Sequence, residues 1–106
     1  MNNENIRPWG NYKVISKIKT ITIKPFESIS LQYHNKRDEF WQILKGSAKI
    51  QINNTIFNAV VNDTFIISKK INHRITGLKD GVQLLEIATG DVEEDDIIRL
   101  EDKYGR

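Results

Sequence analysis

The sequence predicts an all-β fold, a small barrel or sandwich built from short strands. β-Branched apolar residues recur in short runs, and many of them alternate with polar residues in the two-residue period of a strand. Turn-forming residues such as Gly46, Asn53 and Gly81 separate these runs. No stretch shows the period of a long helix. About seven or eight short strands at this spacing are typical of a sandwich or a barrel.

The strand pattern defines the elements in order. It covers residues 14–23, 28–34, 39–44, 48–52, 55–61, 64–68 and 83–88. Asn53 and Asn54 separate two of these runs and predict a tight hairpin, because asparagine tolerates a positive φ better than most residues. Residues 91–96 are almost all acidic, and a run of this kind is usually a solvated surface. Residues 97–104 are expected to form either a short helical turn or an extended clamp.

Composition indicates an ordinary globular protein and argues against several functions. A chain of 106 residues with 39% hydrophobic and 28% charged residues fits one domain over residues 1–106. The net charge is +2, and basic residues are interleaved with acidic ones, which argues against nucleic-acid binding. The chain has no cysteine, so disulfides and thiolate metal sites are excluded.

The sequence also argues against a membrane location. The first five residues are polar and lack the apolar stretch of a signal peptide. No apolar run approaches the roughly 20 residues needed to span a bilayer. We therefore expect a cytoplasmic protein.

Polar side chains on one face of the run at 28–34 form the first part of a candidate metal site. Two-residue alternation places Gln32 and His34 on the same face, together with Ser28 and Ser30. A strand of this kind is also expected at a surface, with its polar face in water. The alternation alone does not separate these two interpretations.

The next runs add two more potential ligands. Glu39 begins an apolar run just beyond a turn, and His73, the other histidine, follows the run at 64–68. Two imidazoles, a carboxylate and an amide oxygen suit zinc, iron, manganese, cobalt or nickel, and they leave coordination positions open for water or substrate. Because only neutral imidazole binds a metal, we expect occupancy to fall below about pH 6.

These residues resemble the motifs of the cupin superfamily. Gln32-x-His34-x4-Glu39-x6-Gly46 is similar to the first cupin motif, with glutamine at its usual first histidine. Ser68-x-Lys70-x-x-His73 corresponds to the second motif, Pro-x-Gly-x-x-His, and keeps only the histidine; Gly77 replaces the usual asparagine. The resemblance implies a cupin double-stranded β-helix with a short C-terminal extension. It also implies one divalent metal, zinc before manganese, cobalt, nickel or iron, on Gln32, His34, Glu39 and His73.

Further motifs resemble the cupin domain of type II mannose-6-phosphate isomerases, which is often fused to a mannose-1-phosphate guanylyltransferase. The similarity runs from Arg7 to Arg106. It includes Arg7-Pro8-Trp9-Gly10-x-Tyr12, Lys19-Thr20-Ile21, Ser30-Leu31-Gln32-Tyr33-His34, Arg37-x-Glu39-x-Trp41, His73-Arg74, the segment 94–99 and Asp102-x-Tyr104-Gly105-Arg106.

This resemblance implies a metal-dependent isomerase that interconverts mannose 6-phosphate and fructose 6-phosphate, or a related sugar phosphate, through an enediol. Two other functions remain open. One is a non-catalytic metal- or sugar-binding cupin that partners a separate sugar nucleotidyltransferase. The other is a different small-molecule cupin enzyme, such as an epimerase or a dioxygenase.

An isomerase needs a base, and Glu86 is the first candidate. It lies in the mostly apolar run at 83–88, where an unpaired carboxylate would be costly, and it matches a glutamate of the family. The alternative is a structural carboxylate paired with an arginine. Lys19 is the second candidate, and its alternative is a surface lysine.

An isomerase of sugar phosphates also needs cations for the phosphate. The resemblance assigns substrate binding to Arg7, Arg99, Tyr104 and Arg106, and counts Arg99 among the catalytic residues with Glu86 and Lys19. In the alternative interpretation, Asp95, Asp96 and Arg99 pair with one another. Trp9 and Trp41 are expected first to serve core or interface packing, and lining of the pocket is the alternative for each. Leu31 and Tyr33, on the strand face opposite the ligands, suit a homodimer interface.

Overall fold

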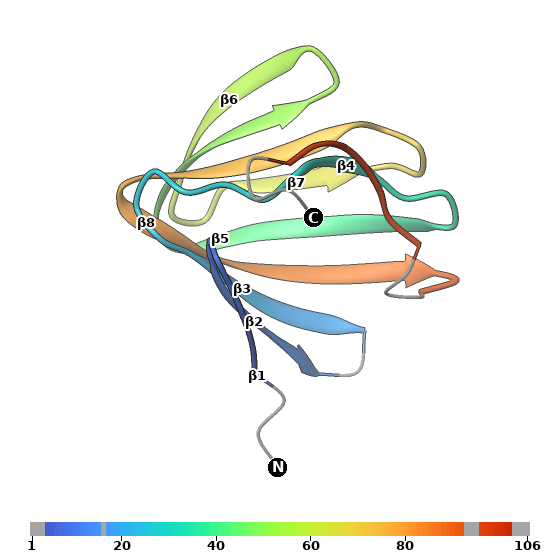
Figure 1. The fold of residues 1–106 in the computed structure, drawn as a ribbon, viewed down its shortest axis with the longest axis horizontal. Helices are drawn as coiled ribbons and strands as arrows, with labels where there is room; N and C mark the ends of the chain where they lie inside the picture. The colour runs from blue at the N-terminus through green and yellow to red at the C-terminus, as the bar shows by residue number, and fades with distance from the viewer. Residues whose placement is uncertain (1–3, 16, 93–95, 103–106) are drawn as a thin grey trace.

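The described residues form one curled antiparallel sheet of nine strands (Figure 1). A computed structural model describes residues 4–15, 17–92 and 96–102. The strands run in the order β1-β2-β3-β8-β4-β9, and β5 pairs with β6, β7 and β8. Their bounds are β1 (Glu4–Arg7), β2 (Gly10–Ile15), β3 (Ile18–Ile23), β4 (Leu31–Tyr33), β5 (Arg37–Ile52), β6 (Thr55–Val60), β7 (Thr64–Ile67), β8 (His73–Gly90) and β9 (Ile98–Glu101). The predicted all-β class is confirmed.

One predicted strand is in fact parts of two. The segment 14–23 contains the end of β2 and all of β3, and Ile15 pairs with Ile18 across the reversal. The sequence hides this turn because no glycine, proline or asparagine marks it. The hairpin at Asn53 and Asn54 was predicted correctly: Ile52 pairs with Thr55, and Asn53 has φ 55°.

Three predicted segments merge into the two long strands that organise the sheet. The segments 39–44 and 48–52 both belong to the single strand β5, and the segment 83–88 lies in the C-terminal half of β8. The two strands pair from Arg37 with Gly90 to Ile52 with His73. Their register shifts around Gly46, so the long ribbon bends there and the sheet folds over itself.

Gly46 is required at this bend, and we expect its replacement to destabilise the fold. Its φ is +76°, and a Cβ would meet the carbonyl oxygen of Gly81 at 2.1 Å. Gly46→Ala should therefore lower the free energy of unfolding by about 3 kcal/mol or more, from the left-handed conformation and the displaced backbone together. Denaturant unfolding followed by tryptophan fluorescence measures the change. Lys45→Ala, at the neighbouring exposed position, should stay within about 0.5 kcal/mol of the parent.

The inward face of the sheet is apolar at one end and polar at the other. On β5 the buried positions alternate, and they carry Arg37, Glu39, Trp41 and Ile43. The apolar end contains the fully buried Ile43, Ile50, Ile75 and Leu84. The polar end contains the buried charged or polar side chains Lys19, Ser30, His34, Arg37, Glu39, His73 and Glu86. So many buried polar groups at one end of a small core mark the place where function is to be sought.

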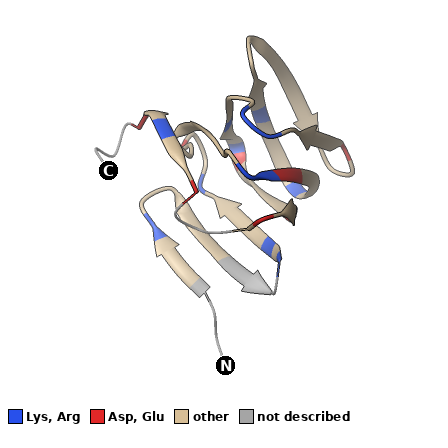
Figure 2. Cartoon of the chain, turned by 90° about the vertical axis from the view of Figure 1, so that its right-hand side faces the viewer, with Lys and Arg blue, Asp and Glu red and all other residues tan. Residues whose placement is uncertain are grey.

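The C-terminal segment lies along β4 as an extended strand rather than a helical turn. Strand β9 pairs with β4, opposing Arg99 to Gln32 and Ile98 to Tyr33, and in Figure 1 the red C-terminal strand passes close to β4. Lys and Arg positions are spread over strands in both halves of the sheet (Figure 2). Within the described part of the chain, no helix has the length and apolar character needed to cross a membrane.

Candidate metal centre and adjoining cavity

Strand register assembles the polar end from residues far apart in the sequence. Gln32 on β4 lies opposite His73 on β8 and Arg99 on β9. In a second row, Glu86 on β8 lies opposite Lys19 on β3 and Trp41 on β5. Because residues that face each other across an antiparallel pair share a face, both rows project into the interior.

Three of the four predicted ligands form a buried cluster. The ligand atoms of His34, Glu39 and His73 all lie within 4.8 Å of one another. His34 Nε2 is 3.2 Å from Glu39 Oε2, and His73 Nε2 is 3.8 Å from Glu39 Oε1. The three residues are at most 2% exposed, so their charges and lone pairs are shielded from water.

Backbone carbonyls fix the tautomer of both imidazoles. His34 Nδ1 lies 2.6 Å from the carbonyl oxygen of Asp96, and His73 Nδ1 lies 3.0 Å from that of Ile71. A carbonyl only accepts, so each Nδ1 must carry the proton, and each Nε2 presents a bare lone pair. A neutral imidazole oriented by a second partner in this way is the form that binds metals.

Burial keeps both histidines neutral. Desolvation lowers the pKa of His34 to about 4, against the carbonyl of Asp96, which raises it, and with the help of the charge on Arg37. Desolvation likewise lowers the pKa of His73. The sequence predicted that metal occupancy falls below about pH 6, which assumes the pKa of an exposed imidazole. Because burial lowers the pKa of His34, this residue stays neutral, and able to bind a metal, at lower pH.

The cluster fits a divalent metal ion. The Nε2 atom of His73 is buried and has no hydrogen-bond partner among the residues that the structure describes, although an unpaired buried acceptor is costly. Glu39 supplies a carboxylate, and Trp41 Nε1 orients it by donating to Oε1 at 3.1 Å. Gln32 faces His73 across the strands, and its Oε1 accepts a hydrogen bond of 2.6 Å from Ser30 Oγ. Two nitrogens, a carboxylate and a nearby amide oxygen suit zinc and its neighbours.

Arg37 also contacts this cluster, a role the sequence did not reveal. Its Nε lies 3.0 Å from Glu39 Oε2, and its NH2 group lies 3.2 Å from His34 Nε2. Arginine only donates, so His34 Nε2 accepts, which agrees with the tautomer set by Asp96. The spacing Arg37-x-Glu39-x-Trp41 is the signal that places all three on one face of β5.

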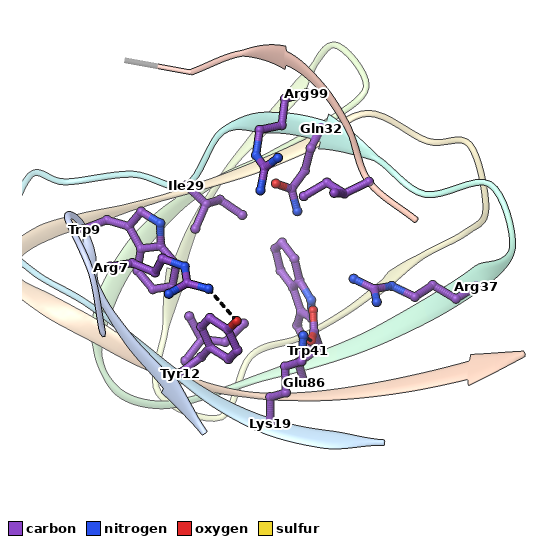
Figure 3. A pocket seen from close by; sticks show the side chains of 12 residues that line it. Arg7, Trp9, Tyr12, Lys19, Ile29, Gln32, Arg37, Trp41, Glu86 and Arg99 are labelled. Carbon is purple, nitrogen blue, oxygen red and sulfur yellow. Dashed lines mark hydrogen bonds and ion pairs between the residues drawn. The ribbon is translucent and has the colours of Figure 1, made fainter. Parts of the chain in front are cut away.

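A cavity of about 210 Å³ adjoins the cluster (Figure 3). The cluster itself does not line it; residues that contact or neighbour the cluster do, among them Arg37, Trp41, Gln32 and Glu86. The other lining residues are Arg7, Trp9, Tyr12, Lys19, Ile21, Ile29, Ile97 and Arg99. The buried ligands and the cavity thus lie next to each other, and side chains such as Arg37 and Trp41 contact the ligands and also line the cavity.

Glu86 and Lys19 form a buried pair on that cavity. Glu86 is 5% exposed and Lys19 is 9% exposed, and Lys19 Nζ lies 3.9 Å from Glu86 Oε2. Burial, together with the charge of Glu39 and a hydrogen bond to it, raises the pKa of Glu86 to about 8, against the opposing charges of Lys19 and Arg37. The surface interpretation of Lys19 is therefore wrong. The structural partner of Glu86 is a lysine rather than the arginine considered from the sequence.

The raised pKa of Glu86 predicts a characteristic pH dependence of stability in the chelator-treated, metal-free protein. The folded chain holds this proton up to pH about 8, whereas the unfolded chain releases it near 4.5. Between these values the folded state binds more protons, so stability falls as pH rises. Glu86→Gln removes this titrating group. The free energy of unfolding of the variant should therefore match that of the parent near pH 5 and exceed it by a few kcal/mol near pH 8.

Denaturant unfolding at several pH values measures the difference between Glu86→Gln and the parent. His34 contributes equally to both proteins, so its opposite effect, a loss of stability as pH falls from 6.5 towards 4, cancels. Glu101→Gln, at an exposed glutamate, is the matched control and should show no such trend. A difference for Glu86→Gln that is independent of pH would contradict the assignment.

Hydrogen-bond donors gather beside this pair, where Lys19 Nζ lies 5.0 Å from the centre of the Tyr12 ring. Arg7 NH2 donates to Tyr12 Oη at 2.9 Å, and Arg7 NH1 donates to the carbonyl of Ile6 at 3.0 Å. Because Tyr12 Oη accepts from Arg7, its own proton is available to another acceptor. Trp9 Nε1 is a buried donor, and no described residue accepts a hydrogen bond from it. Figure 3 shows Arg7, Trp9 and Tyr12 together, with Arg99 across the cavity.

The structure therefore brings most of the predicted site residues to one place. Arg7, Lys19, Gln32, Glu86 and Arg99 line the cavity, beside the cluster of His34, Glu39 and His73. Trp9 and Trp41 belong to the core, as expected, and they also line the cavity, so both interpretations of these residues hold. Tyr104 and Arg106 lie outside the described residues, as does Asp95.

Asp96 has a different role from the pairing with Arg99 considered from the sequence. Its carboxylate accepts backbone N–H bonds from Asn35 at 3.0 Å and Lys36 at 2.9 Å. These bonds lower the pKa of Asp96. They also tie the C-terminal segment to the turn before β5, which holds the Asp96 carbonyl against His34.

A curled antiparallel sheet with histidines and a glutamate at its polar end defines the cupin class. The fold is similar to that of oxalate decarboxylase from Lactobacillus farciminis in its formate complex, with a TM-score of 0.83 at 17% identity, covering 93% of this chain and 34% of that one. The family model described as Mannose-6-phosphate isomerase C-terminal matches residues 1–102. The chain belongs to this family.

The chain is also similar in sequence to part of two longer curated proteins. The chain is 36% identical to mannose-1-phosphate guanylyltransferase ManC of Salmonella typhimurium, over 100% of this chain and 24% of the relative. It is 36% identical to alginate biosynthesis protein AlgA of Pseudomonas putida, over 97% of this chain and 23% of the relative. The chain thus spans about a quarter of the length of these relatives.

Proposed function

We propose that this protein is a metal-dependent isomerase that interconverts mannose 6-phosphate and fructose 6-phosphate, or a closely related sugar phosphate. One observation carries the proposal: the buried carboxyl of Glu86 and the cationic side chains of Arg7 and Arg99 line one cavity, beside the cluster of His34, Glu39 and His73. Family membership supports the same reaction class.

The donor side of the cavity suits a phosphate group. Arg7, Trp9 and Tyr12 offer only donors or a free proton there, Arg99 faces them across the cavity, and an ionised phosphate monoester offers mainly acceptors. Arginine binds such a group through its planar fork. Arg7 is already held in place by Ile6 and Tyr12, so less conformational entropy is lost when the phosphate binds.

The other side of the cavity suits the reacting carbons. His34, Glu39, His73 and Gln32 would hold one divalent ion, with zinc favoured by the donor set and manganese, cobalt, nickel and iron as alternatives. Such an ion supplies Lewis acidity to the substrate oxygens on neighbouring carbons. Among solved structures of similar fold, Bacillus subtilis oxalate decarboxylase, at 20% identity, has Mn(II) centres.

Glu86 is the residue that we propose to move the proton. In the aldose-to-ketose direction its carboxylate takes the proton from C2. The electrons of that C–H bond form a C1=C2 double bond while those of the C1=O π bond move to O1, which gives the enediolate form of the enediol. The same carboxyl then returns the proton to C1 as the O2 hydroxyl proton passes to O1 and the carbonyl re-forms at C2. Atoms and electrons balance without an oxidant or a second substrate. Lys19, 3.9 Å away, stabilises the ionised carboxylate.

Proton exchange into solvent tests this proposal directly. Protein loaded with zinc, cobalt or manganese is incubated with mannose 6-phosphate in D2O, and NMR follows both fructose 6-phosphate and loss of the C2 proton signal. We expect both, and we expect a chelator to abolish both. Metal binding without exchange or product would overturn the isomerase proposal.

That outcome would favour the alternative, a binding cupin that partners a separate sugar nucleotidyltransferase. The separation of the ligand cluster from the cavity and the guanylyltransferase name of a relative favour it as the second candidate. The homodimer and the cytoplasmic location stay predictions. Leu31 and Tyr33 are half-buried, whereas the most exposed large apolar side chain on the described β-strands is Ile66 of β7, at 72%.

A further inference from the structure

Arg37 occupies the position between the ligand cluster and the cavity. It is 5% exposed, it lines the cavity, and its guanidinium contacts both His34 and Glu39. Trp41 also lines the cavity and contacts two of the clustered ligands, Glu39 through its Nε1 and the ring of His73 edge-on, but Arg37 contacts two of them with a positive charge. In Figure 3 the Arg37 side chain extends towards the cavity from the side of β5.

The contact between Arg37 and His34 excludes a metal bond at the same atom. The NH2 group lies 3.2 Å from His34 Nε2, and Nδ1 is committed to the carbonyl of Asp96. A neutral imidazole has one lone pair, at its unprotonated nitrogen. That lone pair either accepts the Arg37 proton or binds a metal ion.

Charge leads to the same conclusion. His34 Nε2 and Glu39 Oε2 are both acceptors and lie 3.2 Å apart, an arrangement that needs a cation beside it. Arg37 Nε, 3.0 Å from Glu39 Oε2, provides that cation. A divalent ion at the same ligands would place two cations together in a buried site, where their repulsion is strong.

We propose that Arg37 is a displaceable resident cation of the ligand cluster. A divalent ion replaces its guanidinium, which turns into the cavity that it already lines and adds a positive charge for an anionic substrate group. Metal occupancy and anion binding are therefore coupled through Arg37. This inference rests on the metal site of the proposed function.

Metal affinity of Arg37 variants is the first test. Calorimetric titration with Co²⁺ should show at least about tenfold tighter binding to Arg37→Met than to the parent protein, because nothing then competes for His34 Nε2. Arg37→Lys, which keeps a charge but loses the two-point contact, should lie between them. Lys49→Met is the matched control: it removes one charge from an exposed position of the same strand and should stay within about threefold of the parent.

The melting temperature gives a second test of whether a metal ion replaces the Arg37 guanidinium. Without metal, Arg37→Met leaves Glu39 without its arginine, so its melting temperature should fall. Saturating Co²⁺ should raise the melting temperature of Arg37→Met by more degrees than that of the parent. Equal rises in the two proteins would contradict displacement.

Sulfate, a tetrahedral dianion, tests the coupling. Saturating Co²⁺ should tighten sulfate binding to the parent at least fivefold, and this gain should largely vanish in Arg37→Met. A gain of equal size in both proteins would mean that the ion acts alone, and would overturn the coupling. Equal Co²⁺ affinity of parent and Arg37→Met would overturn displacement and leave the metal site intact. Absence of Co²⁺ binding to every variant would instead overturn the metal site of the proposed function.

Discussion

His73→Ala should lower the affinity of the protein for Zn²⁺ or Co²⁺ by at least about a thousandfold. Loss of a residue that only orients a ligand commonly costs 10- to 100-fold in metal affinity, and a ligand itself costs more. His73 is 0% exposed, and its Nε2 has no hydrogen-bond partner among the described residues, so no other group takes over its role. Calorimetry, or the visible absorption of bound Co²⁺, measures the change.

The controls for His73→Ala separate ligand loss from a disturbed core. Arg74→Ala alters the next residue of β8, whose side chain pairs with Glu101 at 3.0 Å, and should change the affinity by less than about threefold. Glu39→Gln keeps the shape of a second ligand while removing its charge, and should weaken binding in a core that still folds. Unchanged metal affinity in folded His73→Ala would exclude the proposed centre.

Glu86→Gln should slow isomerisation and C2 proton exchange by about a thousandfold, within the range expected for loss of a general base. Glutamine keeps the size and hydrogen-bonding shape of a protonated carboxyl, so the cavity should be preserved. Metal affinity should change little, because Glu86 is not among the clustered ligands. The effect should therefore fall on kcat rather than on KM.

Lys19→Met distinguishes the two candidate bases. If Lys19 only stabilises the charge of Glu86 across 3.9 Å, its loss should shift the pH profile of turnover to higher pH and leave considerable activity at its new optimum. Abolition of exchange by Lys19→Met, with exchange retained in Glu86→Gln, would reverse the assignment. Glu101→Gln, at an exposed site, serves as the control for both variants.

The strands and several ligands were predictable because their signals are local. Two-residue alternation placed Gln32 beside His34, and an isolated carboxylate in an apolar run pointed to Glu86. Strand boundaries were harder to predict where they depend on contacts between distant parts of the chain. Gly46 appeared to end one strand and start another, whereas the structure uses its positive φ to bend a continuous one.

The missed parts of the site depend on contacts that sequence patterns do not encode. Arg37 lies in the charged stretch 35–39, which is typical of a solvated turn, and only the fold shows that it is buried against Glu39. Asp96 acts through its main-chain carbonyl on a residue 62 positions earlier. Every residue has a main-chain carbonyl, so the sequence cannot show which one contacts His34, and only the three-dimensional structure identifies it.

The hydrogen bond from His34 to the Asp96 carbonyl links the ion site to the segment that leads into β9, the outer strand beside β4. Whatever pulls residues 96–101 away from β4 also frees the His34 ring to change its tautomer. By thermodynamic reciprocity, an ion that holds His34 secures this strand by the same factor by which the strand favours the ion.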